Sequence, residues 1–226
     1  FDSSILAFGN ACKYSIAERI YGAEPYYLNV YEEGDMRALP NQFFHWSFTH
    51  PENPELTWSR TEAEGPGSWY FYTYEDMFVN GYGAKDRDIY RYAEALLLAA
   101  EAIAQSGTVA EAAPYLAQVK ARADMNATEA EITAELAAMS KEAFVEECWK
   151  ERLRELPFDF KIWDDCVRTG MFPVVDATEK GKVTYVNLVG ATNGSGGKFQ
   201  ASDLLWPLSL NEIQRNPNLT QNDGYK

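Results

Sequence analysis

The sequence predicts a mainly α-helical fold, and three observations support this prediction. From Asp88 to about Thr169, Ala, Leu, Glu and Arg recur at the three- and four-residue steps of amphipathic helices. Two Thr-x-x-Glu capping boxes, at Thr108 and at Thr128, mark helix starts within this stretch. The 226 residues, 46% of them hydrophobic, are enough to bury the core of one ordinary domain or of two small ones.

Three regions of the chain differ in composition. Residues 1–87 are predicted to be loop-rich, because they hold 19 of the 32 aromatic residues and turn signals such as Gly65-Pro66-Gly67. Residues 88–170 are the predicted helical core. Residues 171–226 are predicted to form an irregular C-terminal segment.

The helical core is predicted to begin with an antiparallel helix pair. The first helix is expected from Asp88 to Ser106, ending at Gly107, and the second from Thr108 to about Asp124. The pair is close in length to a tetratricopeptide unit of about 34 residues, although the chain holds no second copy of the pattern.

Four further elements are predicted, namely helices over 128–138, 141–156 and 158–168 and a strand over 182–189. Ser140 is placed to cap the second of these helices, and Pro157 is placed to end or kink it. Gly170 stands where the third helix needs a left-handed C-terminal residue. Phe172-Pro173 is expected to begin irregular chain.

The composition argues against several classes of function. The 20 Lys and Arg against 34 Asp and Glu give a formal charge of −14, so no nucleic-acid partner and no attraction to an anionic membrane surface are expected. No run approaches the roughly 18 apolar residues of a spanning helix, since Glu94 and Glu101 interrupt the richest stretch, 93–104.

The N-terminal residues and the cysteines lead to two further expectations, one about targeting segments and one about disulfides and metal sites. The chain opens Phe-Asp-Ser-Ser without a basic and then apolar leader, so any targeting segment is expected to lie upstream or to have been removed. The cysteines are spaced too irregularly for a disulfide framework or a CxxC metal pair and are interpreted as buried or bystander thiols: Cys12, Cys148 and Cys166.

The sequence holds no constellation typical of an enzyme. His45 and His50 lack a nucleophile elbow, and no GxGxxG, P-loop or HExxH motif is present, so no catalytic residue, cofactor or metal is expected. The glutamates of the long helix, Glu147 and Glu151 among them, are interpreted as a solvated face with ion pairs. A glycoside hydrolase that uses Asp164 or Glu151 is the third hypothesis. It ranks last because Asp and Glu residues on helices more often form structural ion pairs.

Clustered rings in residues 1–87 form the candidate ligand site. Flat rings pack on the CH face of a sugar, and planar polar side chains bind its hydroxyls. The predicted stacking residues are Trp46, Trp58, Trp69, Tyr70 and Tyr72. The predicted hydroxyl partners are Asn41, Gln42 and Arg60. The alternative, that these rings only pack the loops against the helices, stays open.

Four blocks of sequence carry a resemblance to a known family. They are Gly34-Asp-Met-Arg37, the Arg-Tyr-Ala-Glu-Ala-Leu-Leu helix at 91–102, the Glu-Arg-Leu-Arg-Glu-Leu and Arg-Thr-Gly pattern within 151–170, and the Asn-Pro-Asn-Leu and Gln-Asn-Asp-Gly-Tyr ending within 204–225. Together and in this order they resemble the SusD/RagB family of Bacteroidetes outer-membrane nutrient-binding lipoproteins, over its C-terminal half.

Two departures from the family pattern stand out. Pro157-Phe158-Asp159-Phe160 occupies the place of an aromatic-Glu-Gly stretch, and Trp206-Pro207-Leu208 replaces an aliphatic-Pro pattern. Cys12 is not the family's lipid anchor, because no apolar leader precedes it. The resemblance therefore implies a lipid anchor, and most of the tetratricopeptide helices, outside this chain.

The resemblance implies a SusD-like α-helical lipoprotein at the cell surface, held in the outer membrane. It implies that the protein binds an oligosaccharide or other nutrient, delivers it to a SusC-like TonB-dependent β-barrel transporter, and is not an enzyme. Helix packing and buried ion pairs are the roles expected for the motif residues Arg91, Tyr92, Glu94, Arg152, Glu155 and Arg168. The alternative is a protein–protein interaction module of the transporter complex, in which the aromatic residues form the interface.

Overall fold

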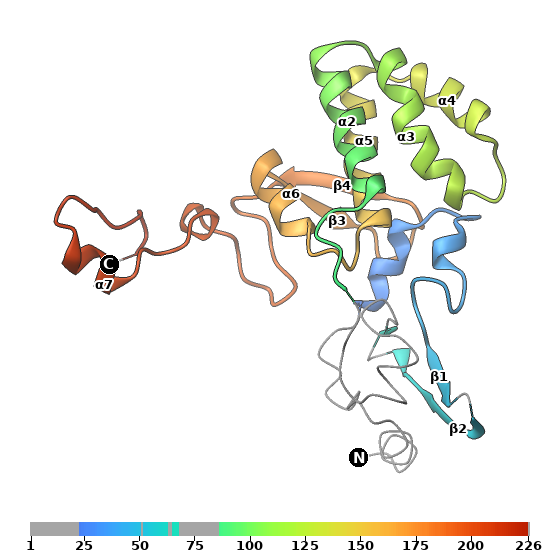
Figure 1. Ribbon diagram of the computed structural model, residues 1–226, viewed down its shortest axis with the longest axis horizontal. Coiled ribbons are helices and arrows are strands. Elements are labelled where there is room, and N and C mark those ends of the chain that lie inside the picture. Colours follow the sequence, from blue (N-terminus) through green and yellow to red (C-terminus); the bar gives the residue numbers. More distant parts are fainter. Residues whose placement is uncertain (1–22, 51, 63–64, 68–85, 226) are drawn as a thin grey trace. The chain divides into compact units, whose positions relative to one another are not determined.

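The computed structural model describes residues 23–50, 52–62, 65–67 and 86–225 (Figure 1). Within them, six α-helices and two two-stranded sheets are joined by 3-10 turns and loops. The prediction of a mainly α-helical fold is therefore confirmed.

The chain divides into two compact units. The first, called here the helical unit, comprises Phe1–Phe160 and Val175–Lys182. The second, the C-terminal unit, comprises Lys161–Val174 and Val183–Lys226.

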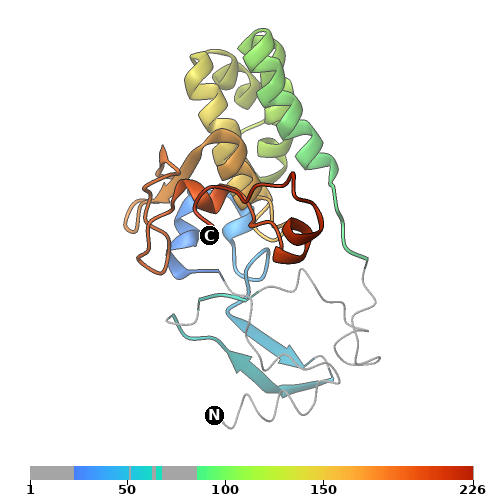
Figure 2. The same ribbon diagram turned by 90° about the vertical axis from the view of Figure 1, so that its left-hand side faces the viewer.

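Four helices build the core of the helical unit: α2 (Tyr92–Ser106), α3 (Val109–Ala123), α4 (Glu129–Ala137) and α5 (Lys141–Glu155). Helix α2 packs against both α3 and α5, and α4 packs against α3 (Figures 1 and 2). The core is made of Leu, Phe and Ala side chains, with Leu97, Leu116, Leu136 and Phe144 among those that are fully buried. Alanines at the contact, such as Ala100, let the helix axes approach closely.

The helices begin where their capping residues predict. The Thr108 hydroxyl accepts a hydrogen bond from the Glu111 N–H, and the Glu111 carboxylate accepts one from the Thr108 N–H. Thr128 forms the same box at α4, and the Ser140 hydroxyl caps α5. Each cap satisfies backbone N–H groups that the first helical turn leaves without an intrahelical partner.

The described part of residues 1–87 holds more regular structure than the sequence predicts. Two 3-10 turns, η1 (Pro25–Val30) and η2 (Met36–Ala38), precede a hairpin of β1 (Ser47–His50) and β2 (Asn53–Ser59). The strands are antiparallel, with Phe48 opposite Trp58. The strands are short, and β2 begins with Asn53-Pro54, residues typical of turns, so the sequence lacks the clear two-residue alternation on which strand prediction depends.

The C-terminal unit corrects two predictions. Helix α6 begins at Ile162 rather than at Phe158 and ends as predicted at Gly170, whose φ is +70°. The delay arises at Phe160, whose φ of +57° is incompatible with a right-handed helix. Residues 171–226 are also less irregular than expected. They form β3 (Met171–Val175), β4 (Val183–Asn187), the 3-10 turn η5 (Ala201–Leu204) and α7 (Leu210–Arg215), with β3 beside β4 in one sheet.

Two predictions from composition can be compared with the structure. Cys148 and Cys166 are buried free thiols, as predicted, and burial raises the pKa of Cys166 to about 11. Cys12 lies outside the described residues. Among the helices that the structure describes, none is long and apolar enough to cross a lipid bilayer.

Candidate functional site

The β1–β2 hairpin holds the described part of the predicted sugar-stacking site. The rings of Phe48 and Trp58 stack with their centroids 5.4 Å apart, and the His45 ring stacks on Phe48 at 5.7 Å. The Arg60 guanidinium lies 5.8 Å from the Trp58 ring, and its Nε donates a hydrogen bond to the Gly65 carbonyl. Burial lowers the pKa of His45, which favours the neutral form of its imidazole.

Some of the predicted ligand residues in and beside the hairpin are buried, and others are exposed. Trp58 is only 4% exposed, so in this arrangement its ring serves packing. Trp46 is half-buried, and its carbonyl accepts a hydrogen bond from the Arg60 N–H at 2.8 Å. Asn41 and Gln42 are exposed in the loop that leads into the hairpin. The other stacking candidates lie outside the described residues: Trp69, Tyr70 and Tyr72.

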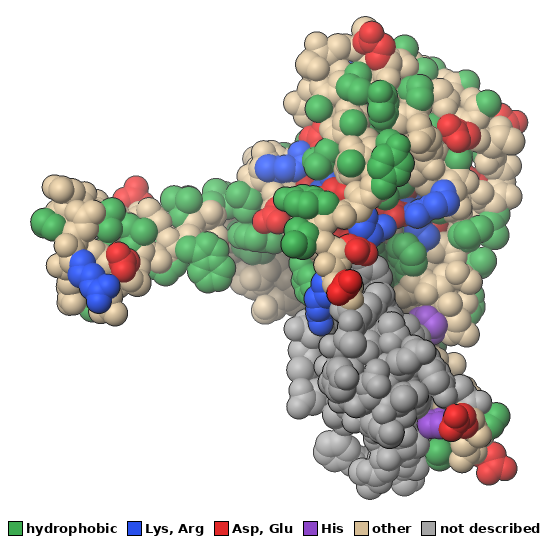
Figure 3. Space-filling model, viewed as in Figure 1, with side chains coloured by type: hydrophobic (Ala, Val, Ile, Leu, Met, Phe, Trp, Pro, Cys, Tyr) green, Lys and Arg blue, Asp and Glu red, His purple; other side chains and the backbone are tan. Residues whose placement is uncertain are grey.

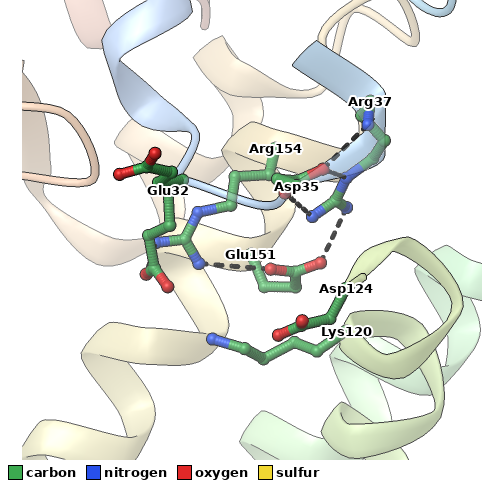
Figure 4. Close-up of a pocket in the computed structure, with 8 residues that line it drawn as sticks. Glu32, Asp35, Arg37, Lys120, Asp124, Glu151 and Arg154 are labelled. Carbon is green, nitrogen blue, oxygen red and sulfur yellow. Dashed lines mark hydrogen bonds and ion pairs between the residues drawn. The ribbon is translucent and has the colours of Figure 1, made fainter. Parts of the chain in front are cut away.

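Among the described residues of the helical unit, the most extensive polar arrangement is a buried ion network between the η2 turn and α5 (Figure 4). Arg37 binds both carboxylate oxygens of Asp35, at 2.6 and 2.9 Å, and its Nη1 contacts Glu151 at 2.7 Å and Glu155 at 3.0 Å. The Asp-x-Arg turn and the Glu-Arg-x-x-Glu-Leu helix, which are separate blocks in the sequence, are therefore two halves of one contact.

Glu155 lies at the centre of this network. Its fully buried carboxylate accepts hydrogen bonds from Arg37, from Arg91 at 2.9 Å and from Arg122 at 2.5 Å. Arg91 also binds both oxygens of Asp159, at 2.8 and 3.0 Å. Ionised carboxylates and guanidinium groups form strong charge-assisted hydrogen bonds, so these contacts hold η2, α2, α3 and α5 together.

The network corrects the interpretation of the long helix as a solvated face. Glu151 and Arg154 are both almost fully buried, and Arg154 donates hydrogen bonds to the Val30 carbonyl at 2.9 Å and to Glu32 at 2.8 Å. The original interpretation suits partly exposed positions, such as the i,i+4 pair of Glu146 and Lys150 at 2.8 Å. A charged helix face can be exposed to water, or it can pair with charged residues of another segment. Here the pairing residues come from a segment distant in the sequence.

The expected roles of the family motif residues are confirmed in part. Arg152 and Glu94 are buried with their charged groups 3.5 Å apart, and Arg91 and Glu155 pair as described. Tyr92, by contrast, is 75% exposed and packs little. Arg168 forms an ion pair with Asp165 at 2.7 Å, but the pair is not buried as expected.

A small polar hollow adjoins the network (Figure 4). Its volume is about 30 Å³, which accommodates a water molecule but not a sugar, since small-molecule pockets span about 300 to 1,000 Å³. Every residue that lines it is charged: Glu32, Glu33, Asp35, Arg37, Lys120, Asp124, Glu151 and Arg154. No group of three or more metal-ligating side chains is arranged for a metal ion in the described part of the chain.

The charges beside the hollow predict how stability depends on pH. Burial raises the pKa of Glu147, but the charges of Arg154 and Lys120 outweigh it, and the pKa is lowered from its ordinary 4.5. Burial lowers the pKa of Lys120, but Glu147 and Glu151 outweigh it, and the pKa is raised from 10.5. Glu147 therefore stabilises the fold above pH 4.5 and loses this effect as the pH falls through its folded pKa, whereas Lys120 stabilises it below pH 10.5 and loses this effect as the pH rises further.

We accordingly expect the melting temperature to be nearly constant around neutral pH and to fall on both sides of this window. Circular dichroism melts from pH 3 to pH 11 test this expectation. Glu147→Gln should lower the melting temperature at pH 7 and flatten the acid side of the profile. An acid limb as steep in this variant as in the parent chain would contradict the assignment to Glu147.

Comparison with family models and comparison with solved structures each give a match. The model of the SusD family matches residues 47–225. A solved SusD superfamily protein from Parabacteroides distasonis ATCC 8503 is similar in structure, with a TM-score of 0.64 and 27% sequence identity. The similarity covers 88% of this chain and 41% of the solved chain, so the chain spans about two-fifths of that protein's length. No curated protein matches the sequence. Because the family match covers more than half of the chain, the protein belongs to the SusD family.

Proposed function

We propose that this chain is part of a cell-surface binding protein that captures an oligosaccharide or other nutrient. In this proposal it delivers the nutrient to a SusC-like TonB-dependent β-barrel, is held at the outer membrane as a lipoprotein, and catalyses no reaction. The observation that carries the proposal is the SusD family match over residues 47–225. The aromatic and polar side chains of the hairpin region support it, because they suit the two surfaces of a sugar.

Within the proposed site, Trp46 supplies a stacking surface, and Asn41 and Gln42 supply hydroxyl partners. All three keep part of their surface open in the described loop and hairpin. Trp69, Tyr70 and Tyr72 remain proposed members of the same site. Trp58 and Arg60 are proposed to support it from beneath, since the buried stack with Phe48 orients the hairpin.

Calorimetric titration against a panel of plant, host and microbial oligosaccharides tests the proposed function. Release of reducing ends is followed in the same tubes. Saturable heat without hydrolysis supports a binding protein and identifies the class of glycan. Hydrolysis that disappears in Asp164→Asn would instead support an enzyme, and silence across the panel would argue against glycan binding.

The Trp46→Ala variant is expected to bind the titrating oligosaccharide about tenfold more weakly, because one stacking surface is lost. The matched control is Trp58→Phe, which keeps an aromatic ring in the covered position and is expected to bind like the parent chain. Calorimetry gives the affinities, and melting temperatures confirm folding. Unchanged affinity in Trp46→Ala would remove Trp46 from the site.

A protein–protein interaction module is the second candidate function, and exposed apolar side chains favour it. Trp206 is 88% exposed, and Leu205 and Leu210 beside it are also open to solvent. Hydrophobic side chains are visible along this segment in Figure 3. An indole so exposed suits an interface anchor. Ligand-independent capture of the SusC-like barrel, abolished by Trp206→Ala, would support this alternative.

A further inference from the structure

The open face of the β1–β2 hairpin carries two cross-strand pairs of hydroxyl side chains. The covered face holds the aromatic stack described above. On the opposite face Thr49 and Thr57 stand directly across from each other, both exposed, with their hydroxyl oxygens 3.0 Å apart. The second pair, Ser47 and Ser59, lies two residues further along the same face, because side chains alternate between the two faces of a strand. The hairpin therefore offers a row of hydroxyl groups on the side that does not pack.

The charged side chains beside this row are almost all negative. The span 41–82 contains every ligand residue proposed above, and in it the sequence has six Asp and Glu residues but a single Lys or Arg, which is Arg60. Glu55 is exposed and stands two residues before Thr57, on the same face as the hydroxyl pairs. Glu62 is exposed just after β2 ends. The region around the open face therefore has a negative potential.

The one arginine of this span is engaged within the hairpin. The Arg60 guanidinium lies 5.8 Å from the Trp58 ring, and its Nε donates a hydrogen bond to the Gly65 carbonyl. Burial lowers the pKa of His45, which favours its uncharged imidazole. A carboxylate or sulfate group brought to the open face would meet the like charge of Glu55, which is unfavourable.

We propose that the open hairpin face is a glycan contact that selects uncharged sugars over sugars that carry uronate or sulfate groups. The inference rests on the proposed function and names the class of its substrate. Serine and threonine hydroxyls both donate and accept hydrogen bonds, as sugar hydroxyls do, so the two sets of groups are complementary. The proposed partners Asn41 and Gln42 are uncharged as well. Repulsion by the surrounding carboxylates excludes the anionic competitors, since specificity depends on disfavouring the wrong ligand as much as on binding the right one.

Matched pairs of oligosaccharides test the selectivity for charge. Cellohexaose, mannohexaose and maltohexaose are each titrated by calorimetry into the full chain, beside the same hexaose oxidised at C6 to the uronate. We expect the neutral hexaose that titrates the chain to bind at least about tenfold more tightly than its uronate in about 50 mM salt, and the ratio to shrink in about 500 mM salt, which screens the repulsion. In Glu55→Gln we expect the ratio to narrow to about threefold while the neutral hexaose binds within about twofold of the parent.

A double variant, Thr49→Val with Thr57→Val, tests the hydroxyl face. Valine keeps the β-branched shape and suits a strand, so only the hydroxyl groups are lost. We expect the neutral hexaose to bind about three- to tenfold more weakly, with the melting temperature close to that of the parent. The matched control is Thr184→Val, an exposed threonine on β4, which is expected to bind like the parent.

The possible outcomes distinguish this inference from the proposed function. A uronate that binds as tightly as its neutral counterpart, or more tightly, would overturn the selectivity while glycan binding stands. Parent-like affinity in the threonine double variant would remove the hairpin face from the contact and leave the proposed function intact. Silence with all of the neutral hexaoses and all of their uronates would refute the inference together with the glycan class on which it rests.

Discussion

Replacing Glu155 with Gln is expected to lower the free energy of unfolding by about 3 to 5 kcal/mol, since it removes the buried counter-charge that three arginines share. The Glu155 side chain is fully buried and contacts Arg37, Arg91 and Arg122 at 3.0, 2.9 and 2.5 Å. Gln keeps the shape of Glu but not its charge, and its amide N–H groups face other donors. The helices and the η2 turn that the carboxylate joins would lose their common contact.

Urea denaturation followed by circular dichroism at pH 7 measures this loss. The matched control is Glu146→Gln on the same helix. The Glu146 side chain is 42% exposed, and its carboxylate pairs with Lys150 at 2.8 Å, so we expect a loss of less than about 1 kcal/mol. Similar losses in the two variants would show that the burial of Glu155 does not increase its contribution to stability.

Replacing Phe144 with Ala is expected to destabilise the fold by about 3 to 5 kcal/mol. Phe144 lies on α5 and is fully buried in the cluster that Leu97, Leu116 and Leu136 complete. Truncation removes the transfer free energy of the ring and leaves a cavity, because helices that are held by their caps and by the ion network cannot close around it.

The control for this substitution is Leu98→Ala on α2, where the side chain is 39% exposed. We expect it to cost less than about 1 kcal/mol, because little buried surface is lost. Both variants are measured by urea denaturation, with the slope against urea compared to the parent. A loss below about 1 kcal/mol for Phe144→Ala would mean that the four-helix cluster can collapse around the missing ring.

The helix boundaries could be predicted because their signals are local. Thr108, Thr128 and Ser140 each cap a helix through an N–H only three residues away, so sequence spacing alone places the contact. Gly170 ends α6 for an equally local reason, its left-handed φ. The two-stranded hairpin was not predicted, because pairing between β1 and β2 depends on a register that the turn residues do not specify.

The candidate ligand site could be predicted only as a region. Composition indicates that rings and planar polar groups are concentrated in residues 1–87, but it cannot say which ring face is open. The structure covers Trp58 with Phe48 and Arg60 and leaves Trp46 half-open. The helix predicted over 158–168 did not anticipate the left-handed backbone of Phe160, a conformation that is unusual for an aromatic residue.

The sequence by itself determined the mainly helical class, the capped ends of α3, α4 and α5, and the family to which the chain belongs. These features depend on contacts within one turn of helix or on residue order along the chain. Only the tertiary structure decided that Glu151 and Arg154 are buried, and that Phe160 is held in a left-handed conformation at the surface. The physical reason is distance along the chain: Arg37 meets Glu151 across 114 residues, and no helical or strand periodicity records so remote a partner.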